Sequence, residues 1–426
     1  MNILVDWGRR NWRTALFLVL SLAANLCACY YFNVGIKYGV ACLMMAWAVA
    51  EFAVKPDFAK ARQMLRFFLL FYFPFLMFWS WSLVLWIMQL QDRDYIVRGS
   101  LNTIYMFTII GYFLSAYYLF GGRSIYLNFY TMCAANTVKL LQVCLAYSSG
   151  QVFSEYFALL RTFTGETGDA IHAMELHDMV FGFGPYIVFF LLYRKKGRLQ
   201  LGHLLLACFF FTLALKRIAV PGVILGALVG GIYLRLPDRF KTLFARLVGY
   251  TAIVGVFLYI WGIRSGVYFQ LADALHIDLM SRDFLFTYYE DLYDFSPTYL
   301  GQGIRFIYEY GQNTTTQVGA VHCVFLEFLI ETGFWCWTIW LFYEMRFRIH
   351  RVAKRFGLRS AAFLLAATVY MWTTFMTDNT SFYWPPNVAY MHLTVFWIDL
   401  SVRQAQCGTA SAALPRRRGL LARVTF

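Results

Sequence analysis

Residues 247–263, LVGYTAIVGVFLYIWGI, decide the fold class of this chain. The run contains no charged residue and is long enough for an α-helix to cross the hydrocarbon core of a bilayer, which takes roughly 17–25 residues. Similar runs at residues 14–32, 67–88 and 101–120 are too many for one cleavable signal peptide. They are apolar on every side, unlike the alternating strands of an outer-membrane barrel. We therefore expect an all-α, polytopic transmembrane helical bundle.

The composition also indicates a membrane protein. Of the 426 residues, 60% are hydrophobic and only 14% are charged, whereas a soluble domain carries about 25% charged residues. The net charge is +14, but the basic residues form clusters beside the apolar runs. That distribution is typical of positive-inside topology and of contact with anionic lipids. We expect the lipid bilayer, and no nucleic acid, among the partners.

Threading the chain from a cytoplasmic N-terminus predicts about twelve spans and places both termini in the cytoplasm. The expected spans are residues 14–32, 36–54, 67–88, 101–120, 125–147, 179–193, 201–216, 218–234, 247–263, 322–343, 360–376 and 388–402. The basic clusters between spans then all lie on the cytoplasmic side, as positive-inside sorting requires. These clusters are residues 55–66, 194–198, 235–246 and 346–359. We expect one membrane domain, residues 1–403, and a disordered basic tail, residues 404–426.

The largest polar segment on the opposite side is the loop of residues 264–321. Connections of roughly sixty residues are uncommon unless they have a function. Apolar residues at helical spacing from Phe284 to Leu292 predict a short helix inside the loop. The loop ends at His322, where an apolar helix begins. We therefore expect ionisable chemistry at this surface of the membrane.

Two basic positions on this side are candidates for anion binding. Lys216 and Arg217 stand at the outer end of one expected span, directly before the next, and break the positive-inside trend, so an anionic partner such as a phosphate group is expected. The alternative is that both side chains extend to lipid headgroups. Arg282, in the long loop, is the second candidate, and its alternative is an ion pair with Asp283 or Glu290.

His322 is the candidate for proton transfer, because a neutral imidazole at the mouth of a helix can take or hold a proton. At about 100° per residue, Glu327 and Glu331 face away from it, so no dyad forms within this helix. We expect these glutamates to hold helices together. His172 and His177 have the wrong spacing for one helix face, and we expect no metal site.

Two further segments on the outer side have open interpretations. The polar and aromatic segment at residues 377–387, with Trp384, fits either interfacial anchoring or sugar stacking. Asn313 begins a glycosylation sequon, which has meaning only in a eukaryotic secretory host.

Residues 322–333, HCVFLEFLIETG, resemble a motif of the O-antigen polymerase and O-antigen ligase superfamily of bacterial inner-membrane glycosyltransferases. Members commonly show a histidine that opens a helix of the form His-(Asn)-x-x-Leu-x-x-x-x-Glu-x-Gly. A Gly-x-Gly precedes it in a large periplasmic loop, and here that is Gly301-Gln302-Gly303. Cys323 stands where asparagine is usual.

The resemblance implies metal-independent, inverting glycosyl transfer without a cofactor, on the periplasmic face, from a glycan on undecaprenyl diphosphate. The Ser-Arg that often begins an earlier span corresponds to Lys216-Arg217, and the loop arginine corresponds to Arg282. His322 would position or deprotonate the acceptor hydroxyl, and Arg282 would stabilise the leaving diphosphate. The residues expected to bind the diphosphate or glycan are Lys216, Arg217, Arg264 and Arg305.

We favour a polymerase that joins lipid-linked repeat units of an exopolysaccharide, capsule or O-antigen, because polymerases are the more numerous and divergent members. An O-antigen ligase, whose acceptor is lipid A core, is the alternative within the superfamily. A lipid-linked oligosaccharide flippase is the competing class, but it would need charges along a central cavity. The expected partners are the undecaprenyl-diphosphate-linked oligosaccharide, the bilayer, a flippase and a chain-length regulator. The expected location is the bacterial inner membrane, with several passes.

Overall fold

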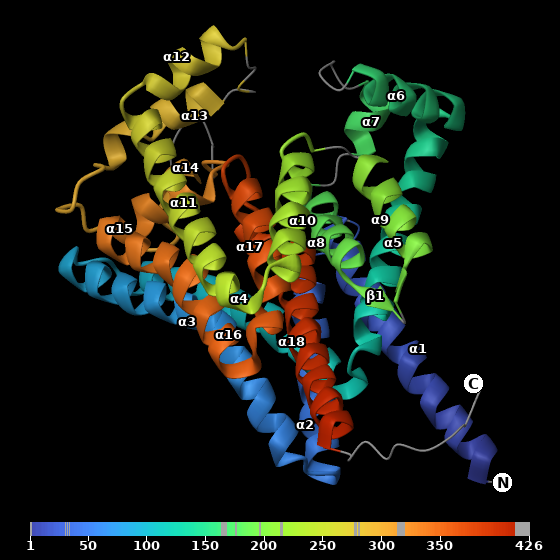
Figure 1. The fold of residues 1–426 in the computed structure, drawn as a ribbon. Coiled ribbons are helices and arrows are strands. Elements are labelled where there is room, and N and C mark those ends of the chain that lie inside the picture. Colours follow the sequence, from blue (N-terminus) through green and yellow to red (C-terminus); the bar gives the residue numbers. More distant parts are fainter. Residues whose placement is uncertain are drawn as a thin grey trace.

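The computed structural model describes residues 2–29, 31, 33, 35–162, 168–174, 177–195, 197–213, 216–276, 279, 282–312 and 320–413. These residues are almost entirely helical, which confirms the all-α class (Figure 1). The strands β1 (Arg194–Lys195) and β2 (Arg198–Leu199) form a short antiparallel hairpin.

The helices differ widely in length and follow one another along the chain. They are α1 (Asn2–Ala28), α2 (Gly35–Val54), α3 (Phe58–Met88), α4 (Arg93–Phe120), α5 (Arg123–Tyr147), α6 (Ser149–Thr162), α7 (Asp169–Met174), α8 (His177–Leu192), α9 (Leu201–Leu213), α10 (Ala219–Arg235), α11 (Asp238–Arg264), α12 (Val267–Ala274), α13 (Arg282–Tyr288), α14 (Phe306–Gln312), α15 (Val324–Phe342), α16 (Arg348–Phe356), α17 (Ala361–Phe375) and α18 (Trp384–Ala413). Short turns join some of them: 3₁₀ turns at Glu290–Leu292, Leu358–Ser360 and Thr380–Phe382, and a π-helical turn at Tyr343–Phe347.

Five helical segments in the described ranges are long and apolar enough to cross a membrane. They are α2, α3, α4, α11 and the continuous segment from α15 to α16, Val324–Phe356. The expectation of about twelve spans is therefore wrong by this measure. Helices α8, α9 and α10 have only 16, 13 and 17 residues, whereas a span takes about 20. A hydrophobic run in the sequence does not show where its helix ends. Counting such runs therefore overestimates the number of spans.

Helix α10 packs along α17 through a row of glycines. Gly222, Gly226 and Gly230 recur at every fourth position and so share one face. A Cβ at Gly226 would lie 2.7 Å from the carbonyl oxygen of Ala366, and small residues of this kind let two helix backbones approach closely. Gly222 faces Thr373. The start of α10 therefore lies beside the end of α17.

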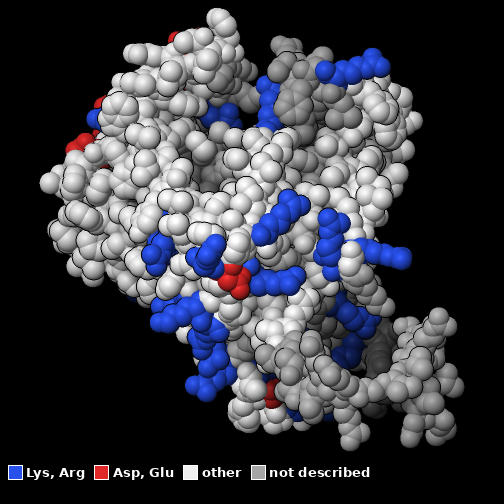
Figure 2. Space-filling model, viewed as in Figure 1, with Lys and Arg blue, Asp and Glu red and all other residues white. Residues whose placement is uncertain are grey.

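The helices of the long loop and the two ends of the described chain lie toward opposite ends of the molecule. Helices α12, α13 and α14 are at one end with α6 and α7, whereas the start of α1 and the end of α18 point toward the other (Figure 1). On the face in Figure 2, Lys and Arg side chains gather around β1 and the lower ends of α10 and α11. The opposite end is hollowed between the α12–α13 and α6–α7 lobes, and basic side chains are visible inside.

The last helix continues to Ala413, into the tail that we expected to be disordered. Residues 404–413 contain four alanines and no proline. Alanine is the best helix former, so this stretch extends α18 readily.

Candidate functional site

The long loop is anchored on α15 through two glycine motifs. Helix α15 is broken at Gly333, whose φ of 73° and ψ of 172° are not helical. The amide of Gly303 donates to the carbonyl of Glu331 at 2.7 Å. A Cβ on Gly301 would lie 2.5 Å from the nitrogen of Gly333, so only glycine permits this approach. The two motifs therefore form a joint that fixes the loop on the helix.

Arg305 belongs to this joint. Its Nε lies 2.7 Å from the carboxylate of Glu309, which is also 3.4 Å from Nε of Arg98. Next to it, the buried carboxylate of Glu331 accepts a hydrogen bond from the amide of Ile307 at 3.3 Å. Glu331 thus has the structural role that we expected. The role of Arg305 in binding substrate stays a prediction, and its guanidinium already contacts Glu309.

Arg264 also has a partner within the protein. It donates to the carboxylate of Glu290 at 2.9 Å, and its guanidinium lies 5.6 Å from the ring centre of Tyr293. Burial raises the pKa of Tyr293, so its phenol stays neutral beside the cation. These contacts attach the end of α11 to the following turn. They offset the charge that we expected to bind a diphosphate.

Arg282 reaches the segment that follows α17. Its Nε and Nη2 donate to the carbonyl oxygen of Thr377 at 3.2 and 2.8 Å, and Nη1 donates to the carbonyl of Leu279 at 3.3 Å. The alternative pairing with Glu290 does not occur, because Glu290 binds Arg264. Neutral carbonyls leave the positive charge of Arg282 uncompensated by these bonds. The guanidinium has five N–H groups, so some remain for a ligand.

His322 faces a carboxylate from the same segment. Its Nδ1 lies 4.0 Å from Oδ1 of Asp378, slightly beyond hydrogen-bond distance. Oδ1 also accepts from the hydroxyl of Tyr383 at 2.5 Å and from the amide of Asn379 at 2.8 Å. His322 is 43% exposed and Asp378 only 5%. A fixed, buried carboxylate beside an accessible imidazole is placed to balance the charge that a proton transfer to the ring would create.

The structure therefore brings His322 and Arg282 to the adjacent residues Thr377 and Asp378. Sequence reasoning missed Asp378, and it assigned the surrounding segment to anchoring or sugar stacking. Trp384 is only 1% exposed, so its ring belongs to the core and is not accessible to a sugar.

Lys216 and Arg217 lie at the same end of the molecule. They are half-buried and precede α10, with the carbonyl of Lys216 accepting from the amide of Ala219 at 2.9 Å. Because the start of α10 packs beside the end of α17, this turn lies near the segment that carries Thr377. Near Arg282, burial raises the pKa of Tyr268, so its phenol is a neutral hydrogen-bonding group.

An apolar groove of about 520 Å³ begins next to the site, between α10, α11, α15 and α17. Phe325 and Met376 line it, and the carbonyl of Met376 accepts from the hydroxyl of Tyr259 at 2.8 Å. Leu247, on the groove wall, is 57% exposed, so the groove opens to the outside of the bundle. A second apolar groove of about 460 Å³ lies between α2, α3 and α4, helices that carry none of the site.

No group of three His, Cys, Asp or Glu residues that could hold a metal ion occurs among the described residues. Glu175, the side chains of His177 and Asp178, and the sequon at Asn313 lie outside them. No protein-family model, curated protein or solved structure matches the chain.

Proposed function

We propose that the chain is a membrane glycosyltransferase that polymerises lipid-linked oligosaccharide repeat units. Its donor is a glycan on undecaprenyl diphosphate, and its acceptor is a sugar hydroxyl of a second lipid-linked chain. The observation that carries this proposal is the meeting of Arg282 and His322 on Thr377 and Asp378, beside an apolar groove. A cation and a proton acceptor next to such a groove suit an amphiphilic donor with an anionic leaving group.

Each polar group then has one role in the reaction. The acceptor hydroxyl attacks the anomeric carbon, and its proton passes to Nε2 of His322. The bond between the anomeric carbon and the diphosphate oxygen breaks with inversion, and its electron pair leaves with the lipid diphosphate. Asp378 stabilises the imidazolium, while Arg282 and Arg217 stabilise the diphosphate. Guanidinium groups take the place of a metal ion, so this mechanism uses no cofactor.

The apolar groove is suited to the polyprenyl chain of the donor. Arg217 precedes α10, and α10 forms one wall of the groove. A diphosphate beside Arg217 and Arg282 would place the attached prenyl chain at the end of the groove near Met376. Burial of each methylene group contributes about 0.8 kcal/mol, so a long prenyl chain would add greatly to the affinity for the donor.

In this proposal the end with α12, α13 and α14 faces the periplasm of a bacterial inner membrane, and both termini are cytoplasmic. The basic clusters near the opposite end support that orientation. Synthesis on this face requires a flippase that delivers lipid-linked units. A chain-length regulator is a further expected partner.

A flippase is the candidate from another class, favoured by the buried pair of Glu344 and Arg348 inside the bundle. The cavity beside this pair measures about 40 Å³, which is far too small for a sugar unit. The polar groups gather at one end of the molecule. This arrangement favours an enzyme that acts on one side of the membrane over a transporter that works by alternating access. An O-antigen ligase would use the same groups and differ only in its acceptor.

Reconstitution of the purified protein in vesicles with lipid-linked repeat units from the host strain tests the proposal. We expect a ladder of longer lipid-linked glycans and release of one undecaprenyl diphosphate for each new linkage. Transfer only to added lipid A core would identify a ligase. Movement of the donor across the bilayer without any new glycosidic bond would identify a flippase and contradict the proposal.

A further inference from the structure

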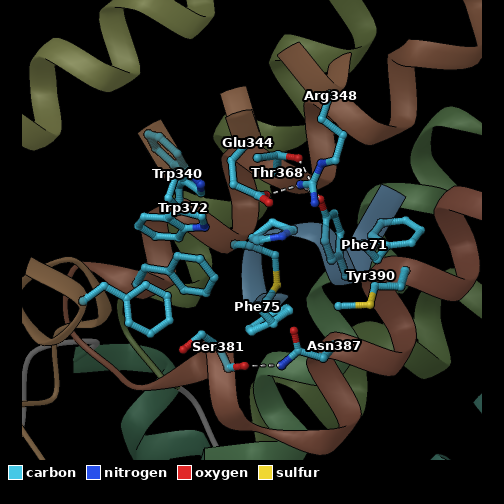
Figure 3. Close-up of a pocket in the computed structure, with 15 residues that line it drawn as sticks. Phe71, Phe75, Trp340, Glu344, Arg348, Thr368, Trp372, Ser381, Asn387 and Tyr390 are labelled. Atoms are coloured by element: carbon cyan, nitrogen blue, oxygen red, sulfur yellow. Dashed lines mark hydrogen bonds and ion pairs between the residues drawn. The ribbon is translucent and has the colours of Figure 1, made fainter. Parts of the chain in front are cut away.

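A small cavity of about 40 Å³ lies inside the bundle, behind the turn that follows Asp378 (Figure 3). It is lined by α3, α15, α16, α17, α18, the π-helical turn Tyr343–Phe347 and the 3₁₀ turn Thr380–Phe382. Seven of its 15 lining residues are aromatic, among them Phe71, Phe75 and Trp340. Polar side chains also enter it from several elements (Figure 3). This mixture distinguishes it from an ordinary packing gap, which is apolar.

A buried ion pair lies along the cavity. Glu344 contacts Arg348, and Arg348 also donates to the hydroxyl of Tyr390. That hydroxyl lies 3.0 Å from the hydroxyl of Thr368. The side chain of Arg348 is only 3% exposed. A charged pair at this depth is stable only when its remaining hydrogen-bonding groups also have partners.

Three donors on the cavity wall have no hydrogen-bond partner in the described part of the chain. They are Nε of Arg348, the indole nitrogen of Trp372 and the hydroxyl of Ser381. These residues are 2%, 4% and 5% exposed. They come from α16, α17 and the turn Thr380–Phe382, yet they line the same small space. Buried donors almost always have acceptors, so this convergence points to a bound acceptor.

The size and charge of the cavity select the acceptor. One water molecule needs at least about 10–15 Å³ of cavity volume. The cavity of about 40 Å³ therefore holds about three water molecules. Water accepts from all three donors and can donate to Glu344. A halide ion would face the carboxylate of Glu344, which repels it. We propose that the cavity is an internal hydration site whose ordered water molecules link Ser381 to the Glu344–Arg348 pair.

This hydration site supports the turn Thr380–Phe382, which follows Asp378. The side-chain amide of Asn387 donates to the carbonyls of Thr380, Ser381 and Tyr383 at 3.0, 3.0 and 2.7 Å. The turn is thus held by Asn387 through its backbone and by water through the hydroxyl of Ser381. Loss of the water would leave the turn, and with it Asp378, less well fixed.

Pulsed X-ray radiolysis of the full-length protein in oxygen-18 water tests for the water directly, because radicals formed from internal water oxidise the side chains around it. Met371 and Met391 line the cavity and are 2% and 3% exposed, and methionine is readily oxidised. We expect both to take up oxygen-18. Met132 and Met179 are 0% exposed and do not line the cavity, so they should stay unlabelled. Absence of label at Met371 and Met391 would overturn the proposal.

A double-mutant cycle tests the link across the cavity. Ser381→Ala and Trp372→Phe each remove one donor, and shared water should make their combined loss in melting temperature differ from the sum of the single losses. The indole nitrogen of Trp337 also has no partner, but its ring packs on Phe257 away from the cavity. Ser381→Ala with Trp337→Phe should therefore be additive. Additivity for the Trp372 pair, or anomalous density for bromide in the cavity, would overturn the water link.

Discussion

His322 is the residue on which the proposed chemistry depends most. Its φ of 53° lies in the left-handed region, which costs a residue other than glycine roughly 1–2 kcal/mol. Backbone strain of this kind is common at functional positions. The next residue, Cys323, is the N-cap of α15. The strained turn therefore places the imidazole off the helix and opposite Asp378.

Replacing His322 with alanine should abolish polymer formation while the amount of folded protein stays nearly normal, because the side chain is 43% exposed. His322→Gly is a sharper control. Glycine relieves the positive φ, so stability should hold or rise by about 1 kcal/mol, whereas activity should fall by at least ~100-fold. Polymer on gels and thermal unfolding of the purified variants measure the two effects. Normal polymer from either variant would remove His322 from the mechanism.

The charge of Arg282 and Arg217 alone should not suffice for activity. Lysine keeps the charge but loses the planar fork, so Arg282→Lys and Arg217→Lys should each lower turnover by roughly 100-fold. Arg264→Lys is the matched control, because Arg264 pairs with Glu290 and a partly exposed ion pair of this kind contributes about 1 kcal/mol. Measuring the turnover of each variant in the reconstituted system distinguishes the two catalytic arginines from the control. An equal loss in all three variants would show that the choice among the arginines is wrong.

At the residue scale, the sequence identified candidate site residues but not the residues that they contact. His322 and Arg282 stood out because charged groups are rare beside apolar helices. Asp378 did not, because helical periodicity relates residues within one helix, and Asp378 meets His322 from a different element. The pairing of Arg305 with Glu309 was also missed, because Arg305 precedes α14 with a φ of 74° and helical spacing does not relate the two residues.

Among the elements, the contact between α10 and α17 depends most on one residue type. A Cβ on Gly226 would meet the carbonyl of Ala366 at 2.7 Å, whereas one on Gly231 would meet nothing within 4 Å. Gly226→Ala should therefore lower stability by about 1–3 kcal/mol through overpacking. Gly231→Ala should hold or raise stability by up to about 1 kcal/mol, because alanine favours the helix. Thermal unfolding in detergent compares the two, and equal shifts would contradict the close packing.

The two apolar grooves provide a matched test of where the prenyl chain binds. A side chain at Gly255 would meet open space in the groove beside the site, so Gly255→Trp should fill it. The KM for a long-chain donor should rise, while a short-chain donor analogue should be unaffected. Val49→Trp fills the groove between α2, α3 and α4 and should change neither value. An increase in KM only with Val49→Trp would show that the prenyl chain binds in the groove between α2, α3 and α4.

The all-α fold class was predictable from the apolar runs, but the residues at which helices begin and end were not. The run at residues 322–343 predicts one uninterrupted helix, yet α15 breaks at Gly333 where the loop backbone approaches it. That break depends on Gly301, which lies in a different segment of the sequence. Short apolar helices such as α9 have the composition of spans but not the length, and no local pattern in the sequence separates the two.

For the whole molecule, the distribution of charge determines the expected orientation. Basic side chains gather near the lower ends of α10 and α11 on the face in Figure 2, and the long loop lies at the opposite end. Lys and Arg are retained on the cytoplasmic side during insertion. The proposed chemistry needs the site on the other side, because the lipid-linked units are joined after they have crossed the membrane.

Two engineered cysteines test this orientation: Thr287→Cys on α13 and Lys354→Cys on α16, both at exposed positions. Replacing the exposed Cys42 with serine removes a native cysteine that could react with the reagent. We expect an impermeant maleimide to label the cysteine at 287 in intact spheroplasts and the cysteine at 354 only after permeabilisation. The basic residues around Lys354 should hold that end of α16 in the cytoplasm. The reverse pattern would place His322 on the cytoplasmic face, where a periplasmic transferase cannot use it to deprotonate its acceptor.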